Sequence, residues 1–216
     1  MKILALDSAT SACSVALWQD GRLLAHRFAE MARGQSEVLV PMVAAVMAEA
    51  GADFASLDLL AVTVGPGAFT GIRIGLSTAR ALALAAGKKL AGIATAEAVA
   101  AAVPEAERQG RTVLVVLDSR RDELWVQAFS AALEPLGEVA ALTPEQVAAL
   151  ELGPLVLAGD ARDLVAPLLK GATLASSAGA PDAARVAELA ARRWAEGSAL
   201  PPEPLYLRPA DVTMPK

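Results

Sequence analysis

LLAVTVGPGAFTGIRIGLSTARALALAAG, residues 59–87, is the stretch that decides how this chain folds. Its first residues, Leu59–Val64, form an apolar, β-branched run that fits a strand covered on both faces. The Gly-Pro-Gly tripeptide at 65–67 ends that strand, and we expect Thr70 to cap a helix that begins near Gly71. The stretch therefore predicts a buried strand, a tight turn and a helix in immediate succession.

Small residues recur at every fourth position of the expected helix and form one stripe along it. Such a stripe lets another backbone come close. Each glycine inside a helix lowers helix stability by about 1 kcal/mol relative to alanine, so close packing is needed to offset this loss. The packing partner is either a neighbouring helix of the same domain or a partner subunit, and both remain open at this point. The stripe consists of Gly71, Gly75, Ala79 and Ala83.

The glycine turn also suggests an anion site, because backbone N–H groups at a helix N-terminus attract phosphate. It lacks the Lys-Ser/Thr ending of a P-loop and does not match G-x-G-x-x-G, so a purely structural turn remains the alternative. Two aspartates, each expected at the end of the first strand of one half of the chain, would complete such a site. The candidate anion- or nucleotide-binding residues are Asp7, Gly65, Gly67, Thr70 and Asp118.

The composition argues against a membrane protein although 55% of the residues are hydrophobic and the mean hydropathy is +0.44. Much of this apolar content is alanine, and no uninterrupted apolar run reaches the ~18 residues that a membrane span needs. Met1 and Lys2 lead straight into a strand-like segment rather than a signal peptide. We therefore expect a cytoplasmic protein without a membrane partner.

Charge and rare residues exclude several kinds of chemistry. A net charge of −5 argues against autonomous binding of nucleic acid. The single cysteine, Cys13, excludes an internal disulfide and is expected in the core. The single histidine, His26, excludes a two-histidine metal site and is expected on a sheet face. No metal-binding residues are therefore expected.

The pattern of elements repeats within the chain. The first half predicts three strands followed by helix, strand, helix, strand and helix, and the second half repeats this order more faintly. This layout is that of two ribonuclease-H-like, or actin-like (ASKHA), lobes of α/β class with a mixed sheet each. The expected domains are residues 1–104 and residues 105–216, the second with an extended proline-rich tail from residue 200.

Five segments together resemble the TsaB (YeaZ) family, and they span both halves and the tail. The block GPGAFTGIRIG is shared with the catalytic sister family TsaD, but the missing histidine pair argues against TsaD-type metal chemistry. Older descriptions place the family among glycoproteases, but this sequence supplies neither the nucleophile nor the metal ligands that such a protease needs. The segments are LALDSAT (4–10), ACSVAL (12–17), GPGAFTGIRIG (65–75), LDSRRDELW (117–125) and EPLYLR (203–208).

The resemblance implies a non-catalytic, accessory subunit. Such a subunit is required to form the threonylcarbamoyl group on the adenosine next to the anticodon, position 37, of tRNAs reading codons that begin with A. It implies a TsaD-like catalytic partner and a TsaE-like ATPase, with tRNA bound only within the complex. No cofactor is expected on this chain alone, whereas the binding of ATP and magnesium within the complex is left open.

The resemblance also implies a helical interface. The two early helices, 36–50 and 71–86, would pair with TsaD or with a second copy of the chain, which favours an external role for the small stripe. The alternative function is an actin-like ATPase or phosphotransferase with Asp7 and Asp118 around magnesium. A structural role for Asp7 in its own turn is equally open. The expected interface residues are Gly71, Ile72, Gly75, Ala79, Ala83, Val43 and Met47, with Leu39 left unassigned.

Overall fold

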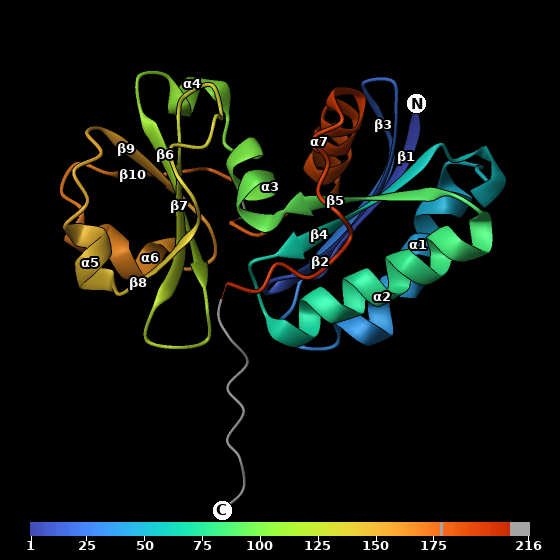
Figure 1. Cartoon of the computed structure of the whole chain (residues 1–216), viewed down its shortest axis with the longest axis horizontal. Coiled ribbons are helices and arrows are strands. Elements are labelled where there is room, and N and C mark those ends of the chain that lie inside the picture. Colours follow the sequence, from blue (N-terminus) through green and yellow to red (C-terminus); the bar gives the residue numbers. More distant parts are fainter. Residues whose placement is uncertain (178, 208–216) are drawn as a thin grey trace, which may run out of the picture.

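The computed structural model describes residues 1–177 and 179–207. Two five-stranded sheets lie side by side, each flanked by helices, and form two lobes (Figure 1). Apart from short helical turns, each half of the chain follows the order βββαβαβα. The expected α/β fold with two such halves is therefore confirmed.

The first sheet has the strand order β3-β2-β1-β4-β5, with β1 in its centre. β1 pairs antiparallel with β2 and parallel with β4. The hairpin between β2 and β3 turns at Asp20 and Gly21, whose φ angles of 47° and 86° are those that an Asp-Gly turn adopts. The strands are β1 (Lys2–Asp7), β2 (Ala12–Gln19), β3 (Arg22–Glu30), β4 (Leu59–Gly65) and β5 (Lys89–Ala94).

Helices cover both faces of the first sheet, which explains why its central strands are apolar on both sides. In β1, Leu4 and Leu6 pack in the core beneath α1 and α2, whereas Ile3 and Ala5 pack in the core beneath α7. This alternation follows from the two-residue period of a strand. The covering elements are α1 (Gln35–Glu49), the short turn η1 (Phe54–Ser56), α2 (Phe69–Ala86) and α7 (Ala183–Glu196).

The second sheet repeats this arrangement, with the order β10-β9-β6-β7-β8. Its central strand β6 pairs antiparallel with β7 and parallel with β9, as β1 does with β2 and β4. The elements are α4 (Glu105–Arg108), β6 (Thr112–Asp118), β7 (Leu124–Phe129), β8 (Ala140–Leu142), α5 (Pro144–Ala148), β9 (Leu155–Ala158), α6 (Arg162–Val165), η2 (Ala166–Leu168) and β10 (Thr173–Leu174).

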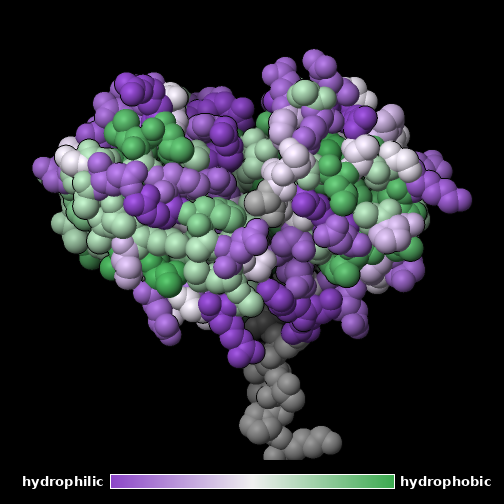
Figure 2. All heavy atoms as spheres, turned by 180° about the vertical axis from the view of Figure 1, so that it is seen from behind, coloured by the Kyte–Doolittle hydropathy of each residue, from purple (hydrophilic) through white to green (hydrophobic). Residues whose placement is uncertain are grey.

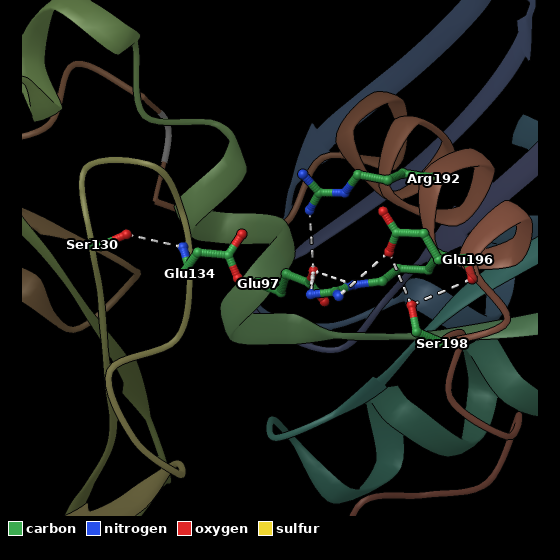
Figure 3. A network of polar contacts seen from close by, with 7 residues as sticks. Glu97, Ser130, Glu134, Arg192, Glu196 and Ser198 are labelled. Atoms are coloured by element: carbon green, nitrogen blue, oxygen red, sulfur yellow. Dashed lines mark hydrogen bonds and ion pairs between the residues drawn. The ribbon is translucent and has the colours of Figure 1, made fainter.

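One helix from each half packs against the sheet of the other half. The last helix, α7, packs on the first sheet, whereas α3 (Thr95–Ala101) contributes Val99 to the core of the second sheet. The two helices meet through Glu97 of α3, which accepts hydrogen bonds from Arg193 Nε at 2.9 Å and Nη2 at 2.5 Å. Figure 3 shows Glu97 beside Arg192 of α7, with which it also forms an ion pair at 3.6 Å. The expected domain boundary between residues 104 and 105 stays a prediction. α3 lies before this boundary and packs in part on the second sheet, and α7 lies after it and packs on the first sheet.

The expected cap of α2 is wrong. The helix begins at Phe69 and its N-cap is Ala68, which has no side-chain hydrogen bond to the helix. Thr70 is instead an exposed residue inside the first turn. The reason is a contact with the β1–β2 turn, because the Ala68 N–H donates to the Ala9 carbonyl at 2.7 Å and so fixes where the helix starts.

Other expectations from composition can be compared with the structure. Cys13 is fully buried, as expected. His26 lies on β3, and its Nε2 is 2.9 Å from Oδ1 of Asp182. Among the described residues, no helix combines the length and apolar character that crossing a membrane requires.

The described part of the tail packs against the first lobe. Leu200 forms an antiparallel bridge with Gly92 of β5, and the Leu205 N–H donates to the Val64 carbonyl at 2.8 Å. Arg80 of α2 holds the Pro202 carbonyl through Nε at 3.0 Å. Backbone contacts thus hold residues 200–207 against the protein, but the side chains of Leu205 and Tyr206 stay 36% and 51% exposed, so the expected packing of the tail is met only in part. Residues 208–216 lie outside the described residues.

The small stripe of α2 packs inside the chain. A β-carbon on Gly71 would overlap the backbone oxygen of Ser8, and one on Gly75 would lie 2.9 Å from the Ser8 hydroxyl oxygen. That hydroxyl donates to the Gly71 carbonyl at 2.9 Å. The glycines therefore let α2 approach the β1–β2 turn, so their packing is internal, but its partner is this turn rather than the neighbouring helix that we expected.

Gly71→Ala should destabilise the protein by about 3 kcal/mol or more, because the added methyl group meets backbone rather than a side chain that can move. Gly87→Ala is the control, since its surroundings are open and only its left-handed φ of 65° opposes alanine, at about 1–2 kcal/mol. Urea unfolding of both variants measures the difference. Equal losses of stability would contradict the close packing of α2.

Candidate functional site

Asp7 ends β1 and is fully buried. Its Oδ1 accepts hydrogen bonds from the Thr63 hydroxyl at 2.5 Å and from the Ala9 N–H at 3.2 Å, whereas Oδ2 has no hydrogen-bond partner among the described residues. Burial raises the pKa of this carboxyl from 3.8 to about 7, although both hydrogen bonds oppose the shift. Asp7 therefore holds its own turn together, as the structural alternative predicted.

Asp118 occupies the corresponding place at the end of β6 but is half-exposed. It accepts the Arg120 N–H at 2.7 Å and pairs with the Arg120 guanidinium at 3.1 Å. Asp160 joins the lobes, because it accepts the Asp118 N–H at 2.9 Å and the Ser11 hydroxyl at 3.4 Å. Burial raises the pKa of Asp160, and the neighbouring Asp118 adds to that rise.

The glycine turn is filled by protein. Gly65 precedes a cis peptide bond to Pro66, and a β-carbon on Gly67 would overlap the backbone oxygen of Ala9. The Gly67 backbone thus lies directly against Ala9, and magnesium would need a carboxylate oxygen that buried Asp7 does not present. Asp7 therefore does not fit a magnesium site, whereas an anion-binding role of Gly65, Gly67 and Thr70 stays a prediction. Within the described residues, no three His, Cys, Asp or Glu side chains gather as a metal site.

The side chains expected at the helical interface are buried within the single chain. The assignment of these residues to an external surface is thus corrected, because they face the first sheet and the β1–β2 turn. Replacing Gly75 with leucine would therefore disturb folding, because the new side chain would meet Ser8 inside the chain. The buried residues are Gly71, Ile72, Gly75, Ala79, Ala83, Val43 and Met47, together with the unassigned Leu39.

Parts of the opposite sides of the same two helices are apolar as well, although α2 also exposes Arg73, Ser77 and Arg80. Leu84 of α2 is 85% exposed and Val40 of α1 is 54% exposed. Around them lie mostly alanines, at the three- and four-residue spacings that make a continuous helix surface. We call this surface the α1–α2 face. It consists of the exposed residues Val40, Pro41, Ala44, Ala45, Ala48, Ala81, Leu84 and Ala85.

A signal in the sequence could have located this face. Residues 38–48, VLVPMVAAVMA, contain no polar residue over three turns of α1. A helix that is apolar on all sides is normally buried on all sides, yet the described part of the chain covers only one side of α1. Figure 2, seen from behind, shows a broad green area at the lower left, on the side of the first lobe. The uncovered side is therefore suited to another protein surface.

Structural neighbours define the class of this fold. The activator of the 2-hydroxyisocaproyl-CoA dehydratase from Clostridium difficile aligns with a TM-score of 0.55 at 11% identity, over 91% of this chain and 97% of that one. YeaZ from Pseudomonas aeruginosa aligns with a TM-score of 0.82 at 31% identity, over 95% of this chain and 99% of that one. The protein is therefore an actin-like (ASKHA) α/β protein.

Sequence relatives narrow this class. A family model described as TsaD, tRNA N6-adenosine threonylcarbamoyltransferase, matches residues 24–154. The chain is 40% identical over 126 residues to the tRNA threonylcarbamoyladenosine biosynthesis protein TsaB of Escherichia coli, a match that covers 58% of this chain and 53% of that protein. It thus spans about half the length of this curated relative. An uncharacterized protein of Mycobacterium tuberculosis is 32% identical over 97% of this chain and 93% of its own length.

With these relatives and the YeaZ structure, the chain belongs to the TsaB (YeaZ) family.

The buried carboxyl of Asp7 predicts a specific pH dependence of stability. Between about pH 4 and 7 the folded protein keeps a proton on Asp7 that the unfolded chain releases, so the free energy of unfolding falls as pH rises through this window. Asp7→Asn removes this titration. The stability of the variant relative to the parent should therefore rise by about 4 kcal/mol from pH 4 to pH 8.

Urea unfolding of both proteins at several pH values measures this change. Other titrating groups affect parent and variant alike, so the difference between the two curves isolates Asp7. Parallel curves would mean that Asp7 is ionised in the folded protein throughout this range.

Proposed function

We propose that this protein is an accessory subunit in the synthesis of threonylcarbamoyladenosine at position 37 of tRNA, and that it acts by binding a TsaD-like catalytic subunit. The single observation that carries the proposal is the α1–α2 face, whose exposed leucine, valine and alanines are not covered by any of the described residues. Membership of the TsaB family and the name of the Escherichia coli relative support the pathway.

The proposed role is non-catalytic. The partner would supply the metal and the reacting groups, and ATP with magnesium and a TsaE-like ATPase would act within the cytoplasmic complex. The alternative, an ATPase or phosphotransferase centred on Asp7 and Asp118, has less support because Asp7 is fully buried and Asp118 pairs with its own turn. A second copy of the chain would use the same α1–α2 face, so self-pairing and partner binding would compete.

Leu84→Asp should weaken binding to the TsaD-like subunit by about 30-fold or more, because it places a charge in the centre of an apolar contact. The side chain is 85% exposed, so the folded monomer should keep its stability. Analytical ultracentrifugation of the full chain mixed with TsaD from the same source measures the complex.

Leu164→Asp is the matched control, since Leu164 is a 60% exposed leucine on α6 of the second lobe. It should leave the complex intact. If both variants bind like the parent, the α1–α2 face is not the binding surface.

A further inference from the structure

Two cavities adjoin between the lobes at the start of α2. One has a volume of about 660 Å³ and lies between the start of α2, the β6–β7 hairpin and the described tail. The other, of about 570 Å³, lies between the β1–β2 turn and the starts of α1 and α2. Ala68, Thr70 and Arg120 line both. We call the two cavities together the arginine groove.

The charged side chains among the described lining residues of this groove are all positive. Four exposed arginines line it, and none of the described lining residues is an aspartate or a glutamate, although the whole chain carries a net charge of −5. Arg120 pairs with Asp118 beside the groove and still keeps 56% of its side chain exposed. Guanidinium groups bind phosphate through paired N–H donors. The arginines are Arg33, Arg73, Arg120 and Arg121.

Aromatic rings stand beside these arginines. Phe69 is 62% exposed and Tyr206 is 51% exposed, and their ring centroids are 6.2 Å apart at an interplanar angle of 31°. The guanidinium carbon of Arg73 lies 3.2 Å from the Phe69 centroid and 5.3 Å from that of Tyr206. Exposed rings combined with arginine form the kind of platform on which unpaired bases stack.

The backbone adds to the positive potential. α1 begins after Gly34 and α2 begins after Ala68, and neither helix has a side-chain cap at this end. Both helix starts line the second cavity. Uncapped N–H groups favour an anion nearby, so they reinforce the arginines of the groove.

We propose that the arginine groove binds an unpaired stretch of RNA, with bases on Phe69 and Tyr206 and phosphates against the arginines. A strand fits better than a single nucleotide, because the arginines are distributed over two adjoining cavities. The choice of RNA over DNA rests on the proposed function, which brings a tRNA to the complex. The groove residues are separate from the α1–α2 face.

Fluorescence anisotropy of a labelled, unstructured 12-nucleotide RNA with the full chain tests this proposal without the partner. Contacts to two to four phosphates predict that log Kobs falls with log[salt] at a slope of about −1.4 to −2.8. Phe69→Ala should weaken binding about tenfold with little change in slope, and Phe69→Tyr should restore it. Arg120→Gln should reduce the slope by about 0.7.

Two control variants distinguish RNA binding in the groove from nonspecific RNA binding and from binding of the TsaD-like subunit. Arg22→Gln changes an exposed arginine at the far end of the first sheet, where Arg22 pairs in register with Gln19 and Gln19 with Lys2, and should leave binding unchanged. Leu84→Asp should lose the TsaD-like subunit yet bind RNA like the parent.

Three results of the RNA titrations would overturn the proposal. They are no binding of the RNA at low salt, equal affinity for a fully paired duplex of the same length, and binding that Phe69→Ala and Arg120→Gln leave unchanged. Binding of AMP without binding of the oligonucleotide would also overturn it, in favour of a mononucleotide site. Equal binding of single-stranded DNA would retain the groove and overturn the choice of RNA.

Discussion

The contact between α2 and the β1–β2 turn is the constraint on which the rest of the structure depends. Gly67 and Gly71 bring backbone against the backbone of Ser8 and Ala9, with no side chain between them. This contact fixes where α2 starts and which side of it faces the sheet. The same contact determines which residues of α2 face outward and places Phe69 and Arg73 at the groove between the lobes.

The packing of α3 and α7 is the second determinant, because it joins two lobes that have separate sheets. α7 covers the sheet of the first half, α3 packs between the two sheets, with Ala98 in the core of the first and Val99 in that of the second, and Glu97 with Arg193 ties the helices together. Asp160 adds a polar link between the β1–β2 turn and the end of β6. These links hold the β6–β7 hairpin opposite the start of α2, which is the geometry that the arginine groove needs.

The sequence predicted the strands and their order along the chain well, because an apolar run such as Leu59–Val64 is stable as a strand only when both of its faces are buried. It could not decide the role of the small stripe, since an internal and an external contact have the same four-residue spacing. Only the distant turn at Ser8 and Ala9 settles that question. The uninterrupted apolar residues 38–48 did contain a readable signal for the α1–α2 face.

The groove and the packing of α3 and α7 depend on tertiary contacts that no local pattern encodes. Arg33, Arg73, Arg120 and Tyr206 come from four distant segments, and only the fold brings them to adjoining cavities. Hydrogen exchange of the full chain, alone and mixed with a TsaD-like subunit, tests most directly where the partner binds. Slower exchange confined mainly to residues 38–48 and 81–86 is the predicted result. Protection confined to the second lobe, with none in α1 or α2, would contradict it.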